Sequence, residues 1–132
     1  MKLIFCIDDR NGHAFNKRRQ SRDRKVIEHI LNSVEGRVLG ISAYSEPLFE
    51  GKSIKTVSGF DDALSLCDAY FEERDVTDDM LQKADSLTIY LWNRAYPGDS
   101  FVNIDEGIWK LESEREFAGS SHDKITVREY RK

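Results

Sequence analysis

The chain opens with an almost continuous apolar run between Lys2 and Ile7. Such a run is typical of a strand that is buried on both faces of a sheet. Turn-forming residues between Asp8 and Gly12 end the run, and a polar, basic segment follows. From residue 21 to residue 35 the apolar positions recur at helical spacing and form one stripe. The opening pattern therefore predicts a buried strand, an irregular loop and a helix.

The residues at both ends of this helix fit the known preferences of helix termini. Ser21 is able to cap the N-terminus with its hydroxyl group, and Gly36 is suited to end the helix. Asp23 lies in the first predicted turn, where the helix dipole favours an anion. The helix is thus expected to begin at Ser21 and to carry an early carboxylate.

The rest of the chain alternates between strand and helix patterns, without a repeat or a linker. Strands are predicted at 37–42, 52–57, 68–72 and 86–92. One helix is predicted at 60–67, and a second one is capped by Thr77 and ends at residue 83. An irregular segment is predicted at 43–51 and a loop at 96–99. Two antiparallel strands, 109–115 and 124–130, close the chain. This order predicts a single α/β domain, residues 1–132, with a mostly parallel central sheet flanked by helices and an antiparallel C-terminal edge.

Composition narrows the class of protein. The 132 residues suffice for one domain with its own core, and 33% of them are charged, with a net charge of −4. This acidic balance argues against nucleic-acid binding, which normally needs a basic excess. Cys6 and Cys67 lie in apolar surroundings, which predicts buried thiols of a reducing compartment. With neither a membrane-spanning segment nor a signal peptide in the sequence, we expect a cytoplasmic protein without membrane contact.

Basic residues gather between positions 17 and 25, although the chain as a whole is acidic. They lie between the end of the first buried strand and the first helix, and open α/β sheets bind ligands at such edges. Guanidinium groups there are able to grip a phosphate or a carboxylate. We therefore predict a site for a small anionic or nucleotide-like ligand, with Asn16, Arg18, Arg19 and Arg22 as binding residues. Two other interpretations stay open: a solvated face paired with acids, and a docking segment for an acidic protein.

The C-terminal half carries a family resemblance. The strand 87–91, the step Gly98-Asp99-Ser100, then Trp109 and a closing strand that ends at Tyr130 resemble dihydrofolate reductase, and the upstream elements follow the same order. The resemblance implies that fold for the whole chain. It also implies that Asp23 is the catalytic carboxylate that binds the pterin ring and supports its protonation. The alternative is that Asp23 only offsets the helix dipole.

The sequence departs from this family where the cofactor would bind. Glu72 and Glu73 stand at the place of a glycine pair that lets the backbone approach the NADPH pyrophosphate. Residues 42–47, which follow the second strand where the family has a phosphate-binding turn, contain no Arg or Lys. Trp92 stands in place of the hydroxyl residue that supports the catalytic acid in the family. Arg24 replaces an apolar residue of the folate pocket. The cofactor is therefore unknown, and NADPH is disfavoured. The rival interpretation is an NAD(P)H-dependent reductase of a pterin-like substrate that uses altered contacts.

A second resemblance concerns the segment from Asp8 to Asp23. It is similar to small uncharacterised bacterial proteins, some of which are labelled ribonuclease Z. A two-zinc nuclease needs clustered His and Asp ligands, whereas His13, His29 and His122 are isolated in this sequence. The residues therefore contradict the label, and no metal site is predicted.

Three further clusters invite a functional interpretation. Trp92 and Arg94 end a strand, and together they are able to stack on a planar ring and to form hydrogen bonds with it. The alternative is that Trp92 is a core residue and that Arg94 belongs to a solvated turn. Asp8 and Asp9 either hold a divalent cation or serve as turn formers, and the turn preferences of Asp favour the second interpretation. The turn 120–123 contains Ser, His and Asp side by side, a spacing that cannot align a catalytic triad, so His122 is expected at the surface. The sequence leaves homo-oligomer formation open.

Overall fold

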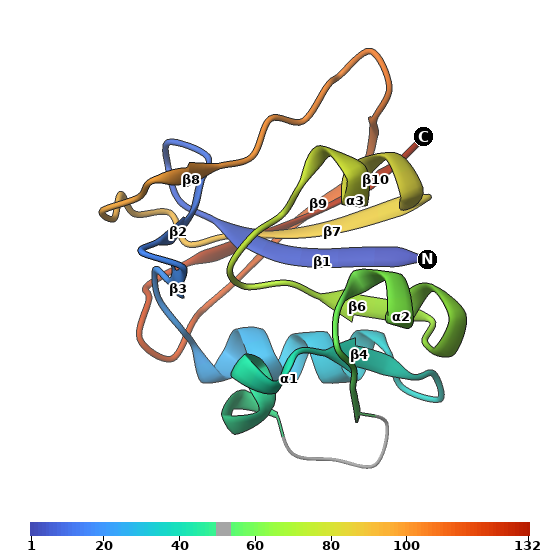
Figure 1. Ribbon diagram of the computed structural model, residues 1–132. Coiled ribbons are helices and arrows are strands. Elements are labelled where there is room, and N and C mark those ends of the chain that lie inside the picture. Colours follow the sequence, from blue (N-terminus) through green and yellow to red (C-terminus); the bar gives the residue numbers. More distant parts are fainter. Residues whose placement is uncertain (50–53) are drawn as a thin grey trace.

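The computed structural model describes residues 1–49 and 54–132 (Figure 1). Its elements, in chain order, are β1 (Lys2–Ile7), β2 (Gly12–Phe15), β3 (Arg18–Arg19), α1 (Arg24–Ser33), β4 (Leu39–Ile41), the 3-10 helix η1 (Ala43–Leu48), β5 (Ile54–Thr56), α2 (Phe60–Leu66), β6 (Ala69–Phe71), α3 (Asp78–Lys83), β7 (Ser86–Leu91), β8 (Ser100–Phe101), β9 (Lys110–Phe117) and β10 (Ile125–Arg131). Within these ranges no helix is both long enough and apolar enough to cross a bilayer.

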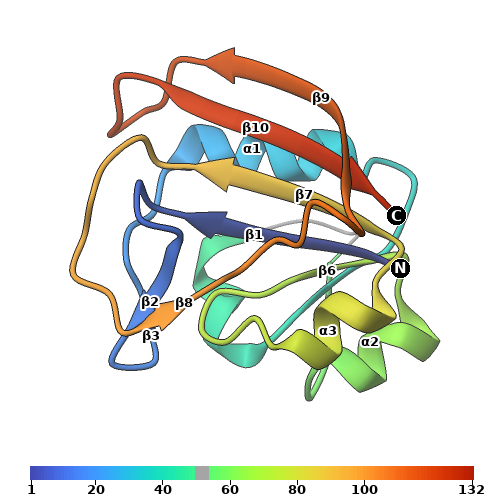
Figure 2. The same ribbon diagram turned by 90° about the horizontal axis from the view of Figure 1, so that it is seen from above.

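Seven strands form the central sheet in the order β5-β4-β6-β1-β7-β10-β9. The five strands from β5 to β7 run parallel, whereas β10 pairs antiparallel with both β7 and β9. Helix α1 covers one face of the sheet, and α2 and α3 cover the other (Figures 1 and 2). The predicted fold class, a mostly parallel sheet with an antiparallel C-terminal edge, is confirmed.

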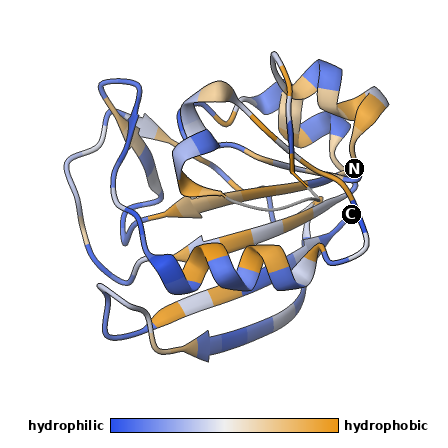
Figure 3. Ribbon diagram, turned by 90° about the horizontal axis from the view of Figure 1, so that it is seen from below, coloured by the Kyte–Doolittle hydropathy of each residue, from blue (hydrophilic) through white to orange (hydrophobic). Residues whose placement is uncertain are grey.

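Strand β1 lies in the middle of the sheet and contributes to both apolar cores. Leu3 and Phe5 pack on the side of α2 and α3, whereas Ile4 and Cys6 pack on the side of α1. Figure 3 shows α1 lying across its face of the sheet, with apolar positions alternating with polar ones along the helix. The continuous apolar run at the start of the sequence arises because both faces of β1 are buried. The second thiol, Cys67, is only partly buried, so the prediction of two buried thiols holds for Cys6 alone.

The start of α1 differs from the prediction by three residues. Asp23, rather than Ser21, is the N-cap, and its carboxylate accepts a hydrogen bond of 2.8 Å from the backbone N–H of Lys25. The helix ends at Ser33, and Gly36 follows with a positive φ of 79°, a conformation that favours glycine. Ser21 is unavailable as a cap because its hydroxyl group lies against His122.

Most of the other predicted elements before residue 92 are found with slightly shorter bounds. Strands β4, β5, β6 and β7 lie inside the four predicted strand ranges, although residues 52–53 of the second range lie outside the described residues. Thr77 caps α3 as predicted, by accepting a hydrogen bond from the backbone N–H of Met80. Residues 43–51 were predicted as irregular, but residues 43–48 form η1, and residues 50–51 lie outside the described residues. Both C-terminal strands are confirmed as an antiparallel pair.

A small second sheet, in the order β3-β2-β8, was not predicted. Its strands β3 and β8 have two residues each, too few to give a pattern in the sequence. Phe15 pairs with Arg18 across a two-residue turn, in which Asn16 and Lys17 have positive φ angles of 51° and 58°. Such angles at both turn residues define a type I′ hairpin, whose twist suits the flanking strands. The segment expected to be an irregular loop is therefore an ordered hairpin.

Lys17→Gly is expected to stabilise the protein by about 0.5–1 kcal/mol, because the left-handed conformation is costly for a residue with a Cβ atom. Urea denaturation would measure the difference. Asn16→Gly is the matched control and should change stability less, since Asn tolerates this conformation. A loss of stability in Lys17→Gly would mean that the lysine side chain makes stabilising contacts that outweigh the strain.

Candidate functional site

The hairpin β2–β3 lies over the carboxyl ends of the central parallel strands and is anchored there by Asp8. This buried carboxylate accepts hydrogen bonds from the backbone N–H groups of Arg10, Gly12 and Tyr96 and from the side-chain amide of Gln20. Burial by itself raises the pKa of Asp8, but these hydrogen bonds outweigh it and lower the pKa. Asp8 is thus a turn former. No group of three metal-binding side chains occurs in the described part of the chain.

An ion pair fastens the hairpin to the end of β6. Arg19 donates to both carboxylate oxygens of Glu73, over 2.7 Å and 2.9 Å, and the hydroxyl group of Ser45 donates to the same carboxylate over 2.7 Å. The ring of Tyr44 lies between the guanidinium groups of Arg19 and Arg74, 4.4 Å and 4.6 Å from its centroid. The protein's own cation therefore neutralises Glu73.

Glu72 turns back onto its own loop. Its carboxylate accepts hydrogen bonds from the backbone N–H groups of Glu73 and Arg74, over 2.9 Å and 3.0 Å. The residue is buried, and burial raises its pKa above the ordinary value. The two acids of this loop thus serve its local structure, one through backbone contacts and the other through Arg19.

Asp23 is buried beneath the turn that joins β9 to β10. Its carboxylate accepts hydrogen bonds from the backbone N–H groups of Lys25, Ser120 and Ser121, and it lies 2.9 Å from Nδ1 of His122. Burial by itself raises the pKa of Asp23, but the bonds from Ser120, His122 and Ser121 hold the pKa far below its ordinary value. A pterin ring would therefore have to displace this turn to reach Asp23, whose catalytic role stays a prediction.

His122 is buried, so the prediction that it lies at the surface is wrong. Its ring stacks on Trp92, with centroids 4.8 Å apart, and its Nε2 atom lies 2.8 Å from the hydroxyl group of Tyr96. The residue sits in a polar turn, which suggested exposure, but the turn folds inward onto Asp23. Contacts between segments so distant in the chain leave no signal in a local pattern.

Ser21, His122 and Asp23 are aligned like a catalytic triad. The Ser21 hydroxyl group lies 3.2 Å from Nε2 of His122, whose Nδ1 faces Asp23. A nucleophile also needs space for an acyl substrate. The cavity beside Ser21 measures only about 10 Å³, which is room for about one water molecule, and Tyr96 competes for Nε2 at a shorter distance. We therefore assign these three residues to structure rather than to nucleophilic catalysis.

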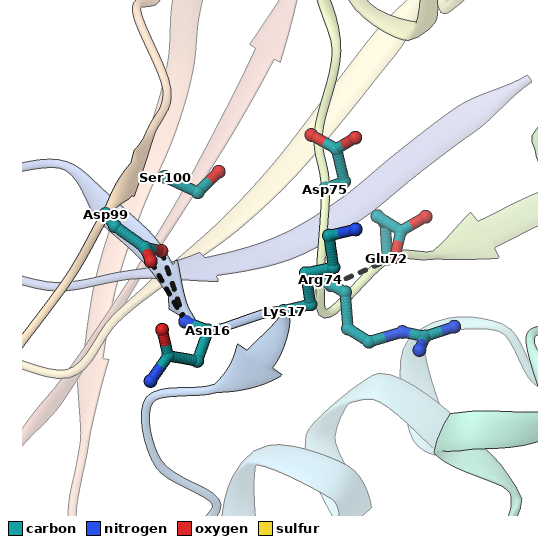
Figure 4. A pocket seen from close by; sticks show the side chains of 7 residues that line it. All are labelled: Asn16, Lys17, Glu72, Arg74, Asp75, Asp99 and Ser100. Carbon is teal, nitrogen blue, oxygen red and sulfur yellow. Dashed lines mark hydrogen bonds between the residues drawn. The ribbon is translucent and has the colours of Figure 1, made fainter.

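A groove of about 730 Å³ lies between the hairpin tip, the loop after β6 and the start of β8. Its lining residues are Asn16, Lys17, Glu72, Arg74, Asp75, Asp99 and Ser100 (Figure 4). The carboxylate of Asp99 accepts a hydrogen bond from the backbone N–H of Asn16, which holds β8 against the hairpin tip. Three acids face two bases there, so the groove is a poor site for an anion.

Two smaller grooves adjoin the basic segment. One, of about 490 Å³, is lined by Phe15, Asn16, Arg18, Arg19, Gln20 and Pro97. The other, of about 350 Å³, lies between the start of α1 and η1 and is lined by Arg22, Asp23, Arg24, Ile27, Glu28, Pro47, Leu48 and Ser121. We call the second one the α1–η1 groove. It combines basic side chains at a helix N-terminus with an apolar wall.

The predicted site residues are distributed over separate places. Asn16, Arg18 and Arg19 share the 490 Å³ groove, although the guanidinium group of Arg19 is bound to Glu73, and Arg22 and Asp23 lie in the α1–η1 groove. Trp92 is buried under His122, and Arg94 lies in the following loop, where its carbonyl group accepts a hydrogen bond from Asp9. Ligand-binding roles for Trp92 and Arg94 stay predictions.

The sequence did not predict which residues share the α1–η1 groove with Arg22. Arg24 was noted only as a departure from the family, and Pro47 and Leu48 were assigned to an irregular segment. The position of η1 beside α1 depends on the tertiary structure.

No protein-family model matches the chain, and no curated protein has a similar sequence. Among solved structures, the dihydrofolate reductase from Enterococcus faecalis, complexed with NADP(H) and RAB-propyl, superimposes with a TM-score of 0.69. The match covers 98% of this chain and 94% of the reductase chain, at 11% sequence identity. The protein therefore has a dihydrofolate reductase-like fold. Similarity at this identity establishes the fold alone, and these findings do not bear on the ribonuclease Z label.

Proposed function

We propose that this protein binds a small anionic ligand in the α1–η1 groove, with Arg22 and Arg24 as the residues that hold the anion. Neither guanidinium group forms an ion pair with a carboxylate among the residues that the structure describes. Unpaired guanidinium groups beside a groove are suited to bind a carboxylate or a phosphate, and this observation carries the proposal.

The two acids that line this groove, Asp23 and Glu28, are already engaged. Glu28 pairs with Lys25 over 3.4 Å, and Asp23 is saturated by the turn above it. The groove also lies beside the N-terminus of α1, where the helix dipole favours negative charge. The local field therefore favours an anion although the chain has a net charge of −4.

The wall of the groove suggests which anions fit. Ile27, Pro47 and Leu48 line it beside the arginines. Ligand sites usually combine such apolar surface with a few polar groups and have volumes of about 300–1,000 Å³. A volume of about 350 Å³ therefore suits a small aromatic or aliphatic acid, or a phosphorylated molecule of similar size.

The standard cofactor site has no comparable support. The groove beside Glu72, where the family resemblance expects the NADPH pyrophosphate, measures about 730 Å³ but is lined by three acids and two bases. An NAD(P)H-dependent reductase would have to hold a pyrophosphate among these acids. The α1–η1 groove presents two arginines without ion pairs among the described residues instead.

The proposal is tested by titrating the ¹⁵N-labelled protein with benzoate, with benzyl alcohol and with inorganic phosphate, followed by NMR. We expect benzoate to shift signals at the start of α1, and benzyl alcohol, which lacks the charge, to bind far more weakly. Arg22→Gln and Arg24→Gln should each raise the Kd for benzoate about tenfold, because each removes a charge-assisted hydrogen bond. Arg18→Gln is the matched control and should leave this Kd unchanged.

Equal binding of benzoate by all three variants would contradict the proposed site. If phosphate alone binds, the ligand is a phosphorylated molecule and the apolar wall plays little part. A parallel titration with NADPH separates the rival function. Saturable quenching of the fluorescence of Trp92 and Trp109 by NADPH would support the reductase instead.

A protein-interaction role is favoured by one observation. Phe15 and Phe101 are 42% and 58% exposed on neighbouring strands of the small sheet, and Phe15 pairs in register with Arg18, which forms no ion pair with a described residue. Arg18→Glu is the variant that tests capture of an acidic partner. Arg19→Glu is unsuitable, because it would set a second carboxylate against Glu73 and disturb the fold.

A further inference from the structure

A small cavity lies beneath the hairpin and is separate from the α1–η1 groove. It measures about 10 Å³ and is lined by Cys6, His13, Arg19, Gln20, Ser21, Phe71, Glu72, Glu73 and Trp92. A volume of about 10–15 Å³ on this measure is the space that one water molecule needs. Two of the lining side chains present buried hydrogen-bonding atoms that have no partner, His13 and Gln20.

His13 presents a bare nitrogen atom. The residue is 3% exposed, and its Nδ1 lies 2.9 Å from the carbonyl oxygen of Cys6. A carbonyl oxygen only accepts hydrogen bonds, so Nδ1 carries the proton of the neutral ring and Nε2 carries a lone pair. Burial lowers the pKa of His13, which keeps the ring neutral. Its Nε2 atom is therefore a buried acceptor without a donor.

Gln20 presents a second fixed acceptor. Its Nε2 donates to a carboxylate oxygen of Asp8 over 3.2 Å and to the carbonyl oxygen of Pro97 over 3.3 Å, so the orientation of the amide is determined. Gly12 and Gly98 pack closely against this amide, since a Cβ atom at either position would lie 2.7 Å or 2.9 Å from Nε2. The amide cannot turn over without loss of both bonds. Its Oε1 atom is buried and unpartnered.

We infer that this cavity binds one small molecule that donates hydrogen bonds to Nε2 of His13 and to Oε1 of Gln20, namely water or ammonium. Buried polar groups in proteins are almost always hydrogen-bonded, and two unsatisfied acceptors beside one void of this size call for one donor with two hydrogens. A metal ion is the weaker explanation, because the described residues contain no cluster of three His, Cys, Asp or Glu side chains that fits one.

Water has a further advantage in this cavity. The thiol of Cys6 also lines it and is able to donate to a water oxygen. Burial raises the pKa of Cys6 well above its ordinary value, so the thiol keeps its proton. The bound molecule would link Gln20, at the end of the hairpin, to His13 on β2 and so hold the hairpin closed over β1.

The test is water–protein cross-relaxation measured by NMR on the ¹⁵N- and ¹³C-labelled protein. We expect a cross-peak of the sign typical of a long-lived water between the solvent resonance and the Hε1 proton of His13. His13→Phe should abolish cross-peaks to the remaining cavity protons, such as those of Cys6. His29→Phe, which alters another partly buried imidazole, should leave them unchanged.

Ammonium is distinguished by thermal unfolding in ammonium chloride and in sodium chloride at equal ionic strength. A higher Tm in ammonium that is lost in His13→Phe would identify ammonium as the donor, and equal Tm values together with the cross-peak would identify water. A cavity without a cross-peak and without an ammonium effect would overturn the inference. So would a cavity cross-peak that survives in His13→Phe. If His13→Phe does not fold, the ¹⁵N chemical shift of Nε2 of His13 in the unmodified protein is the second test. The shift of a hydrogen-bonded Nε2 would support the bound donor, and the shift of a free lone pair would overturn the inference.

Discussion

Asp23→Asn is expected to lower the free energy of unfolding by about 3–5 kcal/mol at pH 7, because the donors around this buried carboxylate lose their charged acceptor. The residue is 2% exposed, and its carboxylate accepts hydrogen bonds from the start of its own helix, α1, and from the distant turn at residues 120–122. An amide in its place offers one acceptor oxygen and brings a donor group against backbone N–H groups. Urea denaturation of both proteins would measure the difference.

The pH dependence of this difference gives an independent check. Because the folded protein holds the pKa of Asp23 far below its unfolded value of about 3.9, the stabilisation is complete only above about pH 5. It is lost progressively as the pH falls from about 5 toward the folded pKa, where the carboxyl group of the unmodified protein also becomes neutral. The gap between the two proteins should therefore narrow in acid.

Asp9→Asn is the matched control, since Asp9 is exposed, and it should change the free energy of unfolding by less than about 0.5 kcal/mol. A gap between Asp23→Asn and the unmodified protein that stays constant from pH 7 to pH 3 would contradict the assigned charge. If instead Asp23→Asn is as stable as the unmodified protein at pH 7, the turn over Asp23 is held by other contacts, and the carboxylate is available to a ligand.

Arg19→Ala is expected to lower the free energy of unfolding by about 2–3 kcal/mol. The carboxylate of Glu73 is 6% exposed and would keep only the hydroxyl group of Ser45 as a partner. Removal of one partner from a buried pair costs about 3–5 kcal/mol, and we expect less here because the side chain of Arg19 is 23% exposed. Chemical denaturation would give the value.

Two variants separate the ion pair from general effects. Arg18→Ala is the matched control, because Arg18 is exposed and makes no ion pair with a described residue, and it should be neutral within about 0.5 kcal/mol. Glu73→Gln should cost less than Arg19→Ala, since the amide leaves no buried charge behind. If Arg19→Ala and Arg18→Ala are equally mild, the hairpin is held by Asp8 and Gln20 rather than by the pair.

The contacts of Arg19 and Asp23 determine which parts of the fold are open to a ligand. Arg19, Glu73 and Tyr44 occupy the region of the expected cofactor turn, and the turn at 120–122 covers Asp23. The arginines at the start of α1 stay without ion pairs among the described residues. The fold resembles a reductase, and the open basic groove lies beside α1. The proposed anion site is placed beside α1 because Asp23 is covered while the arginines there are open.

Local pattern predicted the parts of the fold that depend on burial and on chain ends. β1 was recognisable because both of its faces are covered, and α3 because Thr77 caps it. β3 and β8 were missed because a two-residue strand carries no periodicity and forms only when its partner is near. Ser21 was wrongly predicted as the cap for a similar reason: its hydroxyl group lies against His122, a contact between distant segments that the local pattern does not show.

The sequence alone determined the α/β class, the central place of β1, the antiparallel C-terminal edge and the basic character of the segment before α1, because spacing and composition encode these features. Only the tertiary structure decided which charges are free. Arg19 and Arg22 are equivalent in the sequence, but one meets Glu73 at the end of β6 while the other stays beside an apolar groove. Asp23 and His122 likewise meet across most of the chain. Electrostatic partners are set by distance in space, which a local pattern does not contain.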